Sequence, residues 1–384
     1  MIRNKTPLVL IATLAVVLAG CASKPEPRNA PKELRDFDAT TELDSDWGRS
    51  VGDGLGRARN PIAPARDGGT LFAADASGLV KAIDADSGRQ VWQTQLDVDV
   101  SSGLTAVAQR VYLGTRNGEV LSLDQENGEI EWRADVPSEV LAAPQATNQL
   151  LIVQSGDGTV TALDRRTGDE RWAHTSTEPA LTLRGTGTPQ AIDPVTFVGL
   201  GSGRLVTLDN RNGQPIWERR IAVPRGRSEI ERLVDLDGQP VLTPDGRLFV
   251  TSYNGRVVAL EATSGEVQWQ RELSSYLTPV LVGDRLYVVD ATSHVVALNA
   301  DTGDELWRND TLEGRRLTAP AFADGHLVVG DFAGYLHLID TQNGNLAART
   351  RIDSSGISVR PLTDYRRIYV LANDGHLEAL EIRE

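Results

Sequence analysis

Carboxylates and imidazoles are the side chains of this 384-residue chain that could perform acid–base or metal chemistry. Aspartates recur in the pattern D-x-x-[SNT]-G, which begins at Asp84, Asp124, Asp164, Asp209 and Asp340. A single copy would suggest a ligand site, but a residue that returns at the same point of a repeat is architectural. Turn carboxylates accept backbone N–H bonds, and the glycine takes a left-handed conformation. We therefore expect these aspartates to shape turns.

The five histidines are His174, His294, His326, His337 and His376, and no two have the spacing of zinc ligands. Each falls on an expected strand or hairpin turn, where a packing or surface role is expected. No Ser–His–Asp order, phosphate-binding loop or nucleotide fingerprint stands out. The sequence therefore predicts a protein that is not an enzyme and has no catalytic, cofactor-binding or metal-binding residues.

The spacing of the tryptophans indicates the repeat that positions these aspartates and histidines. Six of the seven lie fourteen residues after a small turn residue, in segments that read alike, such as N-G-E-V-L-S-L-D-Q-E-N-G-E-I-E-W. The tryptophans are Trp92, Trp132, Trp172, Trp217, Trp269 and Trp307, and the turn residues are Gly78, Gly118, Gly158, Gly203, Gly255 and Ser293. A self-similar period of about 40 residues indicates a repeat architecture.

Each repeat contains the signals of four strands. A turn pair such as Asn117-Gly118 precedes alternating apolar residues, the D-x-x-x-G turn and the tryptophan strand, and a further strand and a short apolar stretch lie upstream. Four-stranded units in radial array are propeller blades. Two more turn residues, Gly334 and Gly375, bring the number of blades to eight, although Ala348 stands where the seventh blade would have tryptophan.

The eighth blade lacks its outer strand at the C-terminus. The segment Ser45 to Val51 contains Trp47 and supplies such a strand. We predict that it pairs with the last blade and closes the ring, because an open ring would expose a strand edge. The predicted fold class is therefore all-β, an eight-bladed β-propeller of four-stranded antiparallel blades over residues 44–384.

The chain begins with the features of a bacterial lipoprotein signal peptide, predicted over residues 1–20. Arg3 and Lys5 precede a short apolar stretch, and Leu-Ala-Gly-Cys at 18–21 resembles a lipobox. Cys21 is the only cysteine and the predicted lipidation site. Residues 21–43, which include three prolines, are expected to be the lipidated cysteine and a flexible tether. No Asp follows Cys21, which favours the outer membrane, with the protein facing the periplasm of a Gram-negative bacterium.

The formal net charge of −14 bears on the class of partner. An acidic body disfavours nucleic acid and direct adsorption on anionic lipid. Attachment to the membrane is therefore expected through acyl chains, which contribute about 0.8 kcal/mol for each buried CH₂.

Two repeats are longer than the others. The intervals between turn residues are 45 and 52 residues there, and the surplus lies at 178–187 and 225–238. Insertions in a repeat fold map to loops that often bind. Because the two belong to adjacent blade junctions, we expect them to meet on one rim and form a protein-recognition patch. Its members are Leu181, Leu183, Arg184, Arg225, Arg227, Glu229, Glu231, Arg232, Asp235 and Asp237.

The two insertions also carry a family resemblance. L-T-L-R-G-T-G-T-P at 181–189 and E-I-E-R-L-V-D-L-D at 229–237, with the lipobox, V-G-D-F-A-G-Y-L-H at 329–337 and D-S-S-G at 353–356, resemble the BamB family across the mature chain. These are the propeller lipoproteins of the outer-membrane β-barrel assembly (BAM) machinery. The resemblance implies a scaffold that binds the POTRA domains of BamA and, through it, the other BAM lipoproteins, and that helps deliver nascent outer-membrane proteins. The implied contacts are Leu181, Leu183, Arg184, Asp235 and Asp237.

Two other functions fit a propeller. The run from Ala162 to Trp172 resembles the tryptophan-docking repeat of quinoprotein alcohol dehydrogenases, but those enzymes carry a vicinal cysteine pair that a single cysteine cannot form. A periplasmic polysaccharide or peptidoglycan adaptor is the other alternative. A sugar binder would be expected to present aromatic side chains on exposed loops, and neither insertion contains tryptophan.

Overall fold

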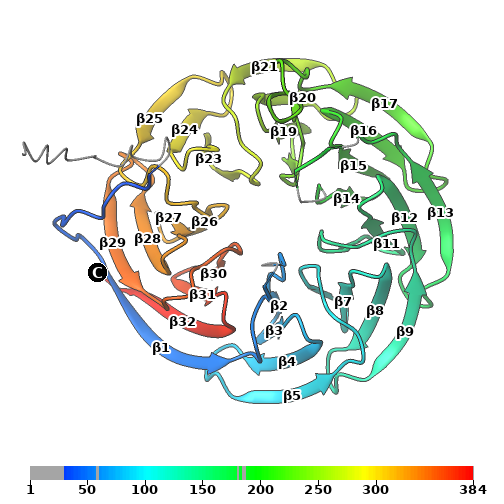
Figure 1. Cartoon of the computed structure of the whole chain (residues 1–384), viewed down its shortest axis with the longest axis horizontal. Helices are drawn as coiled ribbons and strands as arrows, with labels where there is room; N and C mark the ends of the chain where they lie inside the picture. The colour runs from blue at the N-terminus through cyan, green and yellow to red at the C-terminus, as the bar shows by residue number, and fades with distance from the viewer. Residues whose placement is uncertain (1–29, 58–59, 180, 184–186, 384) are drawn as a thin grey trace, which may run out of the picture. The chain divides into compact units, whose positions relative to one another are not determined.

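The structure is a computed structural model that describes residues 30–57, 60–179, 181–183 and 187–383. Residues from Pro31 onward form one compact unit. Its strands form eight four-stranded antiparallel sheets arranged in a ring (Figure 1). The predicted eight-bladed propeller is therefore confirmed.

Each blade runs from a short inner strand to an outer strand on the perimeter (Figure 1). Blade one contains β2 (Ala65–Asp67), β3 (Thr70–Ala74), β4 (Leu79–Asp84) and β5 (Gln90–Gln95), and blade two contains β6 (Thr105–Val107), β7 (Arg110–Gly114), β8 (Glu119–Asp124) and β9 (Ile130–Asp135). Blade three contains β10 (Gln145–Ala146), β11 (Leu150–Gln154), β12 (Thr159–Asp164) and β13 (Glu170–Thr175), and blade four contains β14 (Gln190–Ile192), β15 (Val195–Gly199), β16 (Arg204–Asp209) and β17 (Pro215–Arg220). Blade five contains β18 (Val241–Leu242), β19 (Arg247–Thr251), β20 (Arg256–Glu261) and β21 (Val267–Glu272), and blade six contains β22 (Val280–Val282), β23 (Arg285–Val289), β24 (Val295–Asn299) and β25 (Glu305–Asn309). Blade seven contains β26 (Ala321–Ala323), β27 (His326–Gly330), β28 (Tyr335–Asp340) and β29 (Leu346–Arg351). Blade eight contains β30 (Leu362–Asp364), β31 (Arg367–Leu371), β32 (His376–Arg383) and β1 (Glu42–Ser50).

The ring closes where the first and last strands pair. β1 runs antiparallel to β32, from Glu42 opposite Arg383 to Ser50 opposite His376. The register shifts by one residue between Ser45 and Trp47. The predicted closure by an N-terminal strand is confirmed, and it leaves β32 with a partner on both sides.

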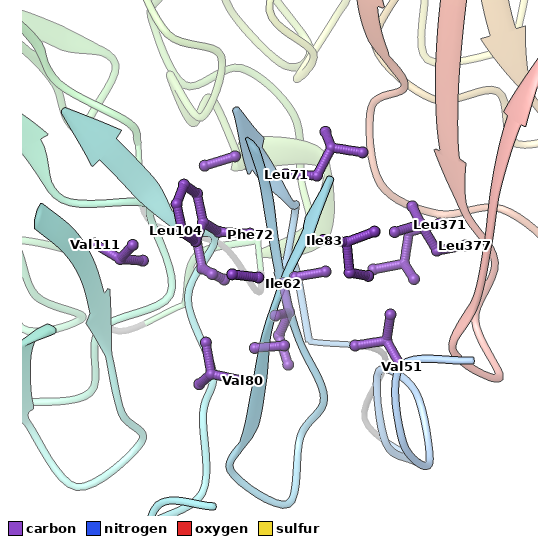
Figure 2. Packing of buried hydrophobic residues seen from close by; sticks show 14 of the residues in the cluster. Val51, Ile62, Leu71, Phe72, Val80, Ile83, Leu104, Val111, Leu371 and Leu377 are labelled. Carbon is purple, nitrogen blue, oxygen red and sulfur yellow. The ribbon is translucent and has the colours of Figure 1, made fainter. Parts of the chain in front are cut away.

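The core lies between neighbouring blades. Successive residues of a strand point to opposite faces of its sheet. Thus Leu71 and Phe72 of β3 point to opposite sides of the first blade, with Leu371 beyond Leu71 on the eighth blade and Val111 beyond Phe72 on the second (Figure 2). All four are fully buried. The packing of each blade on its neighbours explains how repeats can exceed the usual size of a domain.

Seven tryptophans join consecutive blades in the same way. Each indole Nε1 donates to the backbone carbonyl of the second residue of a D-x-x-x-G-type turn on the next blade. The indole ring lies over the glycine of that turn, and a Cβ added to this glycine would lie 2.5–2.7 Å from the nearest indole atom. The pairs are Trp47–Gly88, Trp92–Gly128, Trp132–Gly168, Trp172–Gly213, Trp217–Gly265, Trp269–Gly303 and Trp307–Gly344. The turn carboxylates bond backbone amides, as Asp84 does with Ser87 at 2.9 Å, so the architectural interpretation of these aspartates is confirmed.

The junction between blades seven and eight is the exception, and its geometry explains Ala348. The outer strand of blade eight, β1, comes from the N-terminal side of the chain, so in the described residues no hairpin connects β32 to it and no docking glycine lies there. A tryptophan at this position would have nothing to dock on. Ala348 is instead 3 % exposed, in a cluster against which Leu43 and Ile352 pack.

Residues 32–41, here called the N-terminal strap, lie against blades six and seven. Lys32 Nζ is 3.1 Å from a carboxylate oxygen of Asp310. The backbone amide of Thr40 donates to the carbonyl of Ala347 at 2.9 Å. This part of the expected tether therefore contacts the propeller, and β1 begins two residues before the predicted boundary.

The predicted signal peptide and Cys21 lie outside the described residues, so both stay predictions. In the part of the chain that the structure describes, no helix combines the length and the apolar character needed to cross a membrane.

Candidate functional site

The two insertions meet on one rim of the propeller, as the sequence predicted. The first insertion (residues 176–189) connects β13 to β14, and the second insertion (residues 221–240) connects β17 to β18. The amide of Leu183 donates to the carboxylate of Asp235, and the amide of Thr188 donates to the carbonyl of Asp237 at 3.4 Å. Two segments about 50 residues apart in the chain are thus joined directly.

A close approach of backbones supports this junction. A Cβ at Gly187 would lie 2.7 Å from the carbonyl oxygens of both Gly199 and Leu236. Any larger residue would push the first insertion away from blade four and from the second insertion. Glycine is therefore required here for space rather than for an unusual φ angle.

The second insertion contains a short 3₁₀ turn, η1 (Ile230–Arg232). Within it, Glu231 accepts bonds from the amides of two residues that precede the turn, Arg227 at 2.6 Å and Ser228 at 3.3 Å. These bonds hold the pKa of Glu231 below its ordinary value. The side chain of Ile230 is 68 % exposed, which presents an aliphatic group to solvent.

The residues predicted for partner binding divide into exposed and buried groups. Leu181 is 45 % exposed, and Leu183 is half-buried. Asp235 is only 1 % exposed and Asp237 is half-buried, so Asp235 does not present its carboxylate to solvent, as a direct contact with a partner would require. The reason is its bond to the Leu183 amide, which turns the carboxylate inward. Arg184 lies outside the described residues.

A third carboxylate, Glu178 of the first insertion, joins this pair. A Cβ at Gly201 would lie 2.8 Å from Glu178 Oε2 and 3.3 Å from Asp235 Oδ1, so these two oxygens are near neighbours. Both are buried and have no hydrogen-bond partner among the described residues. A cavity of about 20 Å³ lies beside Glu178, is also lined by Asp237 and Gln154, and has room for about one water molecule.

Burial makes these three acids weak, and repulsion from neighbouring carboxylates adds to the effect on Glu178 and Asp237. Burial, then the Asp235 charge, raises the pKa of Glu178 to about 7, although the amides of Gly201 and Ser202 oppose the shift. Burial raises the pKa of Asp235 to about 6, against the effect of the Leu183 amide. Burial, then Asp235 and Glu178, raises the pKa of Asp237 to about 8. Like charges brought together in a poorly solvated place favour the protonated form.

Sequence reasoning did not single out Glu178 or Gln154. Glu178 is one acid among 53, and only the folding of two distant segments brings it beside Asp235. Gln154 ends a buried strand and carries no local signal. The insertion lengths located the site, but no pattern in the sequence distinguished its buried acids from its exposed ones.

No group of three or more His, Cys, Asp or Glu side chains in the described ranges has an arrangement suited to a metal ion. The most deeply buried histidine, His337, lies 2.9 Å from Asp331, which Arg315 also contacts at 2.7 Å. Burial lowers the pKa of His337 below its ordinary value, although the Asp331 carboxylate opposes the shift. Because all three side chains are buried, this group fits the packing role expected for the histidines.

Comparison with known proteins identifies the relatives of this chain. A family described as the outer membrane protein assembly factor BamB matches residues 40–112, 76–298 and 291–384. The protein of that name from Pseudomonas aeruginosa is 46 % identical over 383 residues, covering 100 % of both chains. That from Escherichia coli K12 is 35 % identical over 86 % of each chain.

Solved structures agree with these relatives. The crystal structure of BamB from Moraxella catarrhalis has a TM-score of 0.81 at 27 % identity, covering 88 % of this chain and 100 % of that one. The quinohemoprotein alcohol dehydrogenase from Comamonas testosteroni has a TM-score of 0.67 at 13 % identity, over 88 % of this chain and 76 % of that one. At that identity the likeness concerns the fold alone.

Proposed function

The chain belongs to the family of the outer membrane protein assembly factor BamB, and on that premise we propose that it is a non-catalytic subunit of the outer-membrane β-barrel assembly machinery. In this role it docks on the periplasmic POTRA domains of BamA and helps deliver β-barrel proteins for insertion. Its relatives are named as assembly factors, whereas the dehydrogenases share only the propeller.

The observation that carries the proposal is the junction of the two insertions. They are the surplus segments of an otherwise regular repeat, and the bond between Leu183 and Asp235 joins them on one rim. Leu181 and Ile230 present apolar groups there. Exposed apolar side chains beside satisfied polar backbone are typical of a protein-recognition surface.

The docking site consists of the five residues that the resemblance implies: Leu181, Leu183, Arg184, Asp235 and Asp237. The two leucines supply apolar area, and the two acids supply negative charge that complements the partner. Arg184, next to Leu183 in sequence, is the cationic member of the site. Contacts with the other BAM lipoproteins pass through BamA.

The lipid anchor completes the proposal. Acylation of Cys21 holds the protein at the periplasmic face of the outer membrane. The acidic body, with a net charge of −14, gives no reason for direct adsorption on anionic lipid. Cys21→Ser is expected to release the protein from the membrane fraction unless its partner retains it, so lipid labelling of Cys21 is the decisive measurement.

The docking site is tested by co-purification of BamA from detergent-solubilised membranes with the tagged, full-length chain. Leu181→Ala with Arg184→Ala, or Asp235→Ala with Asp237→Ala, is expected to abolish capture while the propeller stays folded by circular dichroism. His326→Ala on β27 is the control and is expected to capture BamA normally. Wild-type yield from both folded double variants would place the docking site elsewhere.

A further inference from the structure

We propose that Asp235 is a positioning residue of the docking surface, which fixes the first insertion through the Leu183 amide and makes no contact with the partner itself. The proposal rests on the docking function above and assigns a different role to one of its five residues. It predicts that a hydrogen-bond acceptor at position 235 is sufficient and that the negative charge is dispensable.

The contacts of Asp235 connect three parts of the rim. Its carboxylate accepts the Leu183 amide of the first insertion. Its own carbonyl accepts the amide of Tyr253, in the β19–β20 turn of blade five, at 2.9 Å. The next residue, Leu236, donates to the carbonyl of Leu200 in blade four at 3.4 Å. Asp235 therefore fastens the first insertion to a segment that is itself held by two blades.

The bond to Leu183 controls an exposed part of the surface. Leu181 lies two residues before Leu183 and is one of the apolar groups presented to solvent. On the other side, Thr188 bonds the carbonyl of Asp237, and Gly187 is buried between blade four and Leu236. The Leu183 bond and the Thr188 bond thus fix the insertion before and after Arg184 in the sequence. Loss of the first would release Leu181 while leaving the second attachment in place.

The burial of Asp235 argues against a direct ion pair with a partner. With 1 % of its surface exposed, it cannot reach a cation across an interface unless the first insertion moves aside. Movement of the insertion would break the Leu183 bond that orients Leu181. Direct contact and positioning are therefore mutually exclusive uses of this carboxylate.

The neighbouring charged and titratable groups are consistent with an acceptor role. The charge of Asp235 acts on two neighbouring acids, Glu178 and Asp237, and Tyr276 lies near Asp237. The charge at position 235 raises the pKa of both neighbouring acids, so a neutral acceptor there removes this repulsion while it keeps the bond to Leu183. Asparagine has the size and the acceptor oxygen that this role needs.

The experiment compares Asp235→Asn with Asp235→Ala in the full-length lipoprotein and measures the affinity for BamA in detergent. Asn is expected to bind within about threefold of wild type, because it keeps the acceptor for Leu183. Ala is expected to weaken binding by at least about tenfold, because a buried amide loses its partner. Thermal midpoints of both variants exclude unfolding as the cause.

Three results would overturn the proposal: Asn as weak as Ala, which would show that the charge contacts the partner; Ala equal to wild type; or full protection of the Leu183 amide in the Ala variant. Amide hydrogen exchange of Leu183 measures whether its hydrogen bond holds the first insertion in place when no partner is present. Protection is expected to persist in the Asn variant and to fall in the Ala variant. If wild type itself fails to capture BamA, the docking function fails, and hydrogen exchange still decides the positioning.

Discussion

Trp47 of the N-terminal strand packs on Gly88 of the first blade, with its indole Nε1 3.1 Å from the carbonyl of Ala85. The same relationship joins Trp307 to Gly344 and five other pairs of consecutive blades. The contact that closes the ring therefore uses the same chemistry as the contacts inside it, and the two ends of the propeller meet as if they were an ordinary blade junction.

Removing β1 is expected to open the ring. Deletion of residues 42–50 unpairs β32 and removes Trp47, so the protein is expected to lose thermal stability and to aggregate through the exposed edge. Trp47→Ala alone is expected to cost about 3–5 kcal/mol. Differential scanning calorimetry and light scattering measure both effects, and deletion of residues 22–29 serves as the control. An unchanged midpoint without β1 would contradict the closure.

Installing the missing tryptophan is expected to destabilise the protein. Ala348→Trp restores the repeat pattern, but blade eight has no docking glycine and Ala348 is already enclosed. Overpacking of this kind costs typically about 1–3 kcal/mol. Urea denaturation measures the free energy of unfolding, and a gain in stability would show that the pattern rather than the junction geometry governs this position.

The buried acids predict a stability that falls as pH rises. The pKa values of Glu178, Asp235 and Asp237 are raised to about 7, 6 and 8, from ordinary values of 4.5 and 3.8. The folded state thus holds more protons than the unfolded state between about pH 4 and pH 8, and the free energy of unfolding decreases across that window. The stabilisation that the protonated acids give is fully present below their pKa values in the unfolded state and is lost above their pKa values in the folded state.

Denaturation from pH 5 to pH 8.5 measures this slope. The variant with Glu178→Gln and Asp237→Asn is expected to show a flatter profile and higher stability than wild type at pH 8. Asp209 and Glu261, whose pKa values are lowered to about 2, act in the opposite direction but only below about pH 4.5. A wild-type profile that rises between pH 5 and pH 8 would contradict the buried cluster.

An apolar contact through Ile230 of the second insertion is also expected. Ile230→Asp places a charge at the most exposed aliphatic side chain of the two insertions, among the described residues, and is expected to reduce BamA capture by at least about tenfold. Ile216→Asp is the matched control, because Ile216 is 52 % exposed but lies near the start of β17, at the opposite end of the strand from the second insertion. Equal capture by both variants would remove Ile230 from the interface.

Gly187→Ala tests the close approach of the insertions. The added methyl group meets two backbone oxygens at 2.7 Å, so the first insertion is expected to shift while the blades keep their strands. BamA affinity is expected to fall, with an unchanged far-ultraviolet circular dichroism spectrum. Ala at Gly69, where a Cβ would have nothing within 4 Å, is the control that is expected to bind normally.

The fold could be predicted because its signals are local. A turn pair, an alternating strand, a D-x-x-x-G turn and a tryptophan all fall within sixteen residues, so a blade can be recognised from a short stretch of sequence. The strand register and the docking pairs follow from repetition. Ala348, read from the sequence only as a departure, needed the topology of blade eight for its explanation.

The site was predictable in location but not in detail. Interval lengths placed the insertions on one rim, and the bond between Leu183 and Asp235 bears that out. The inward turn of Asp235 was not predictable, because period-two alternation applies to a regular strand and the segment around 235 is not one. Glu178 entered the site only through tertiary contact, which no pattern within either insertion encodes.

The pairing of β1 with β32 also sets an order of events in the folding of this protein. β1 precedes the other propeller strands in the chain, and β32 follows them among the described residues, so β1 stays unpaired until the eighth blade is present. Neighbouring blades can pack on one another before that point, but the eighth remains an unfinished sheet. The pairing of β1 with β32 is therefore the step that turns an open row of blades into a ring, and loss of either strand leaves an unpaired edge.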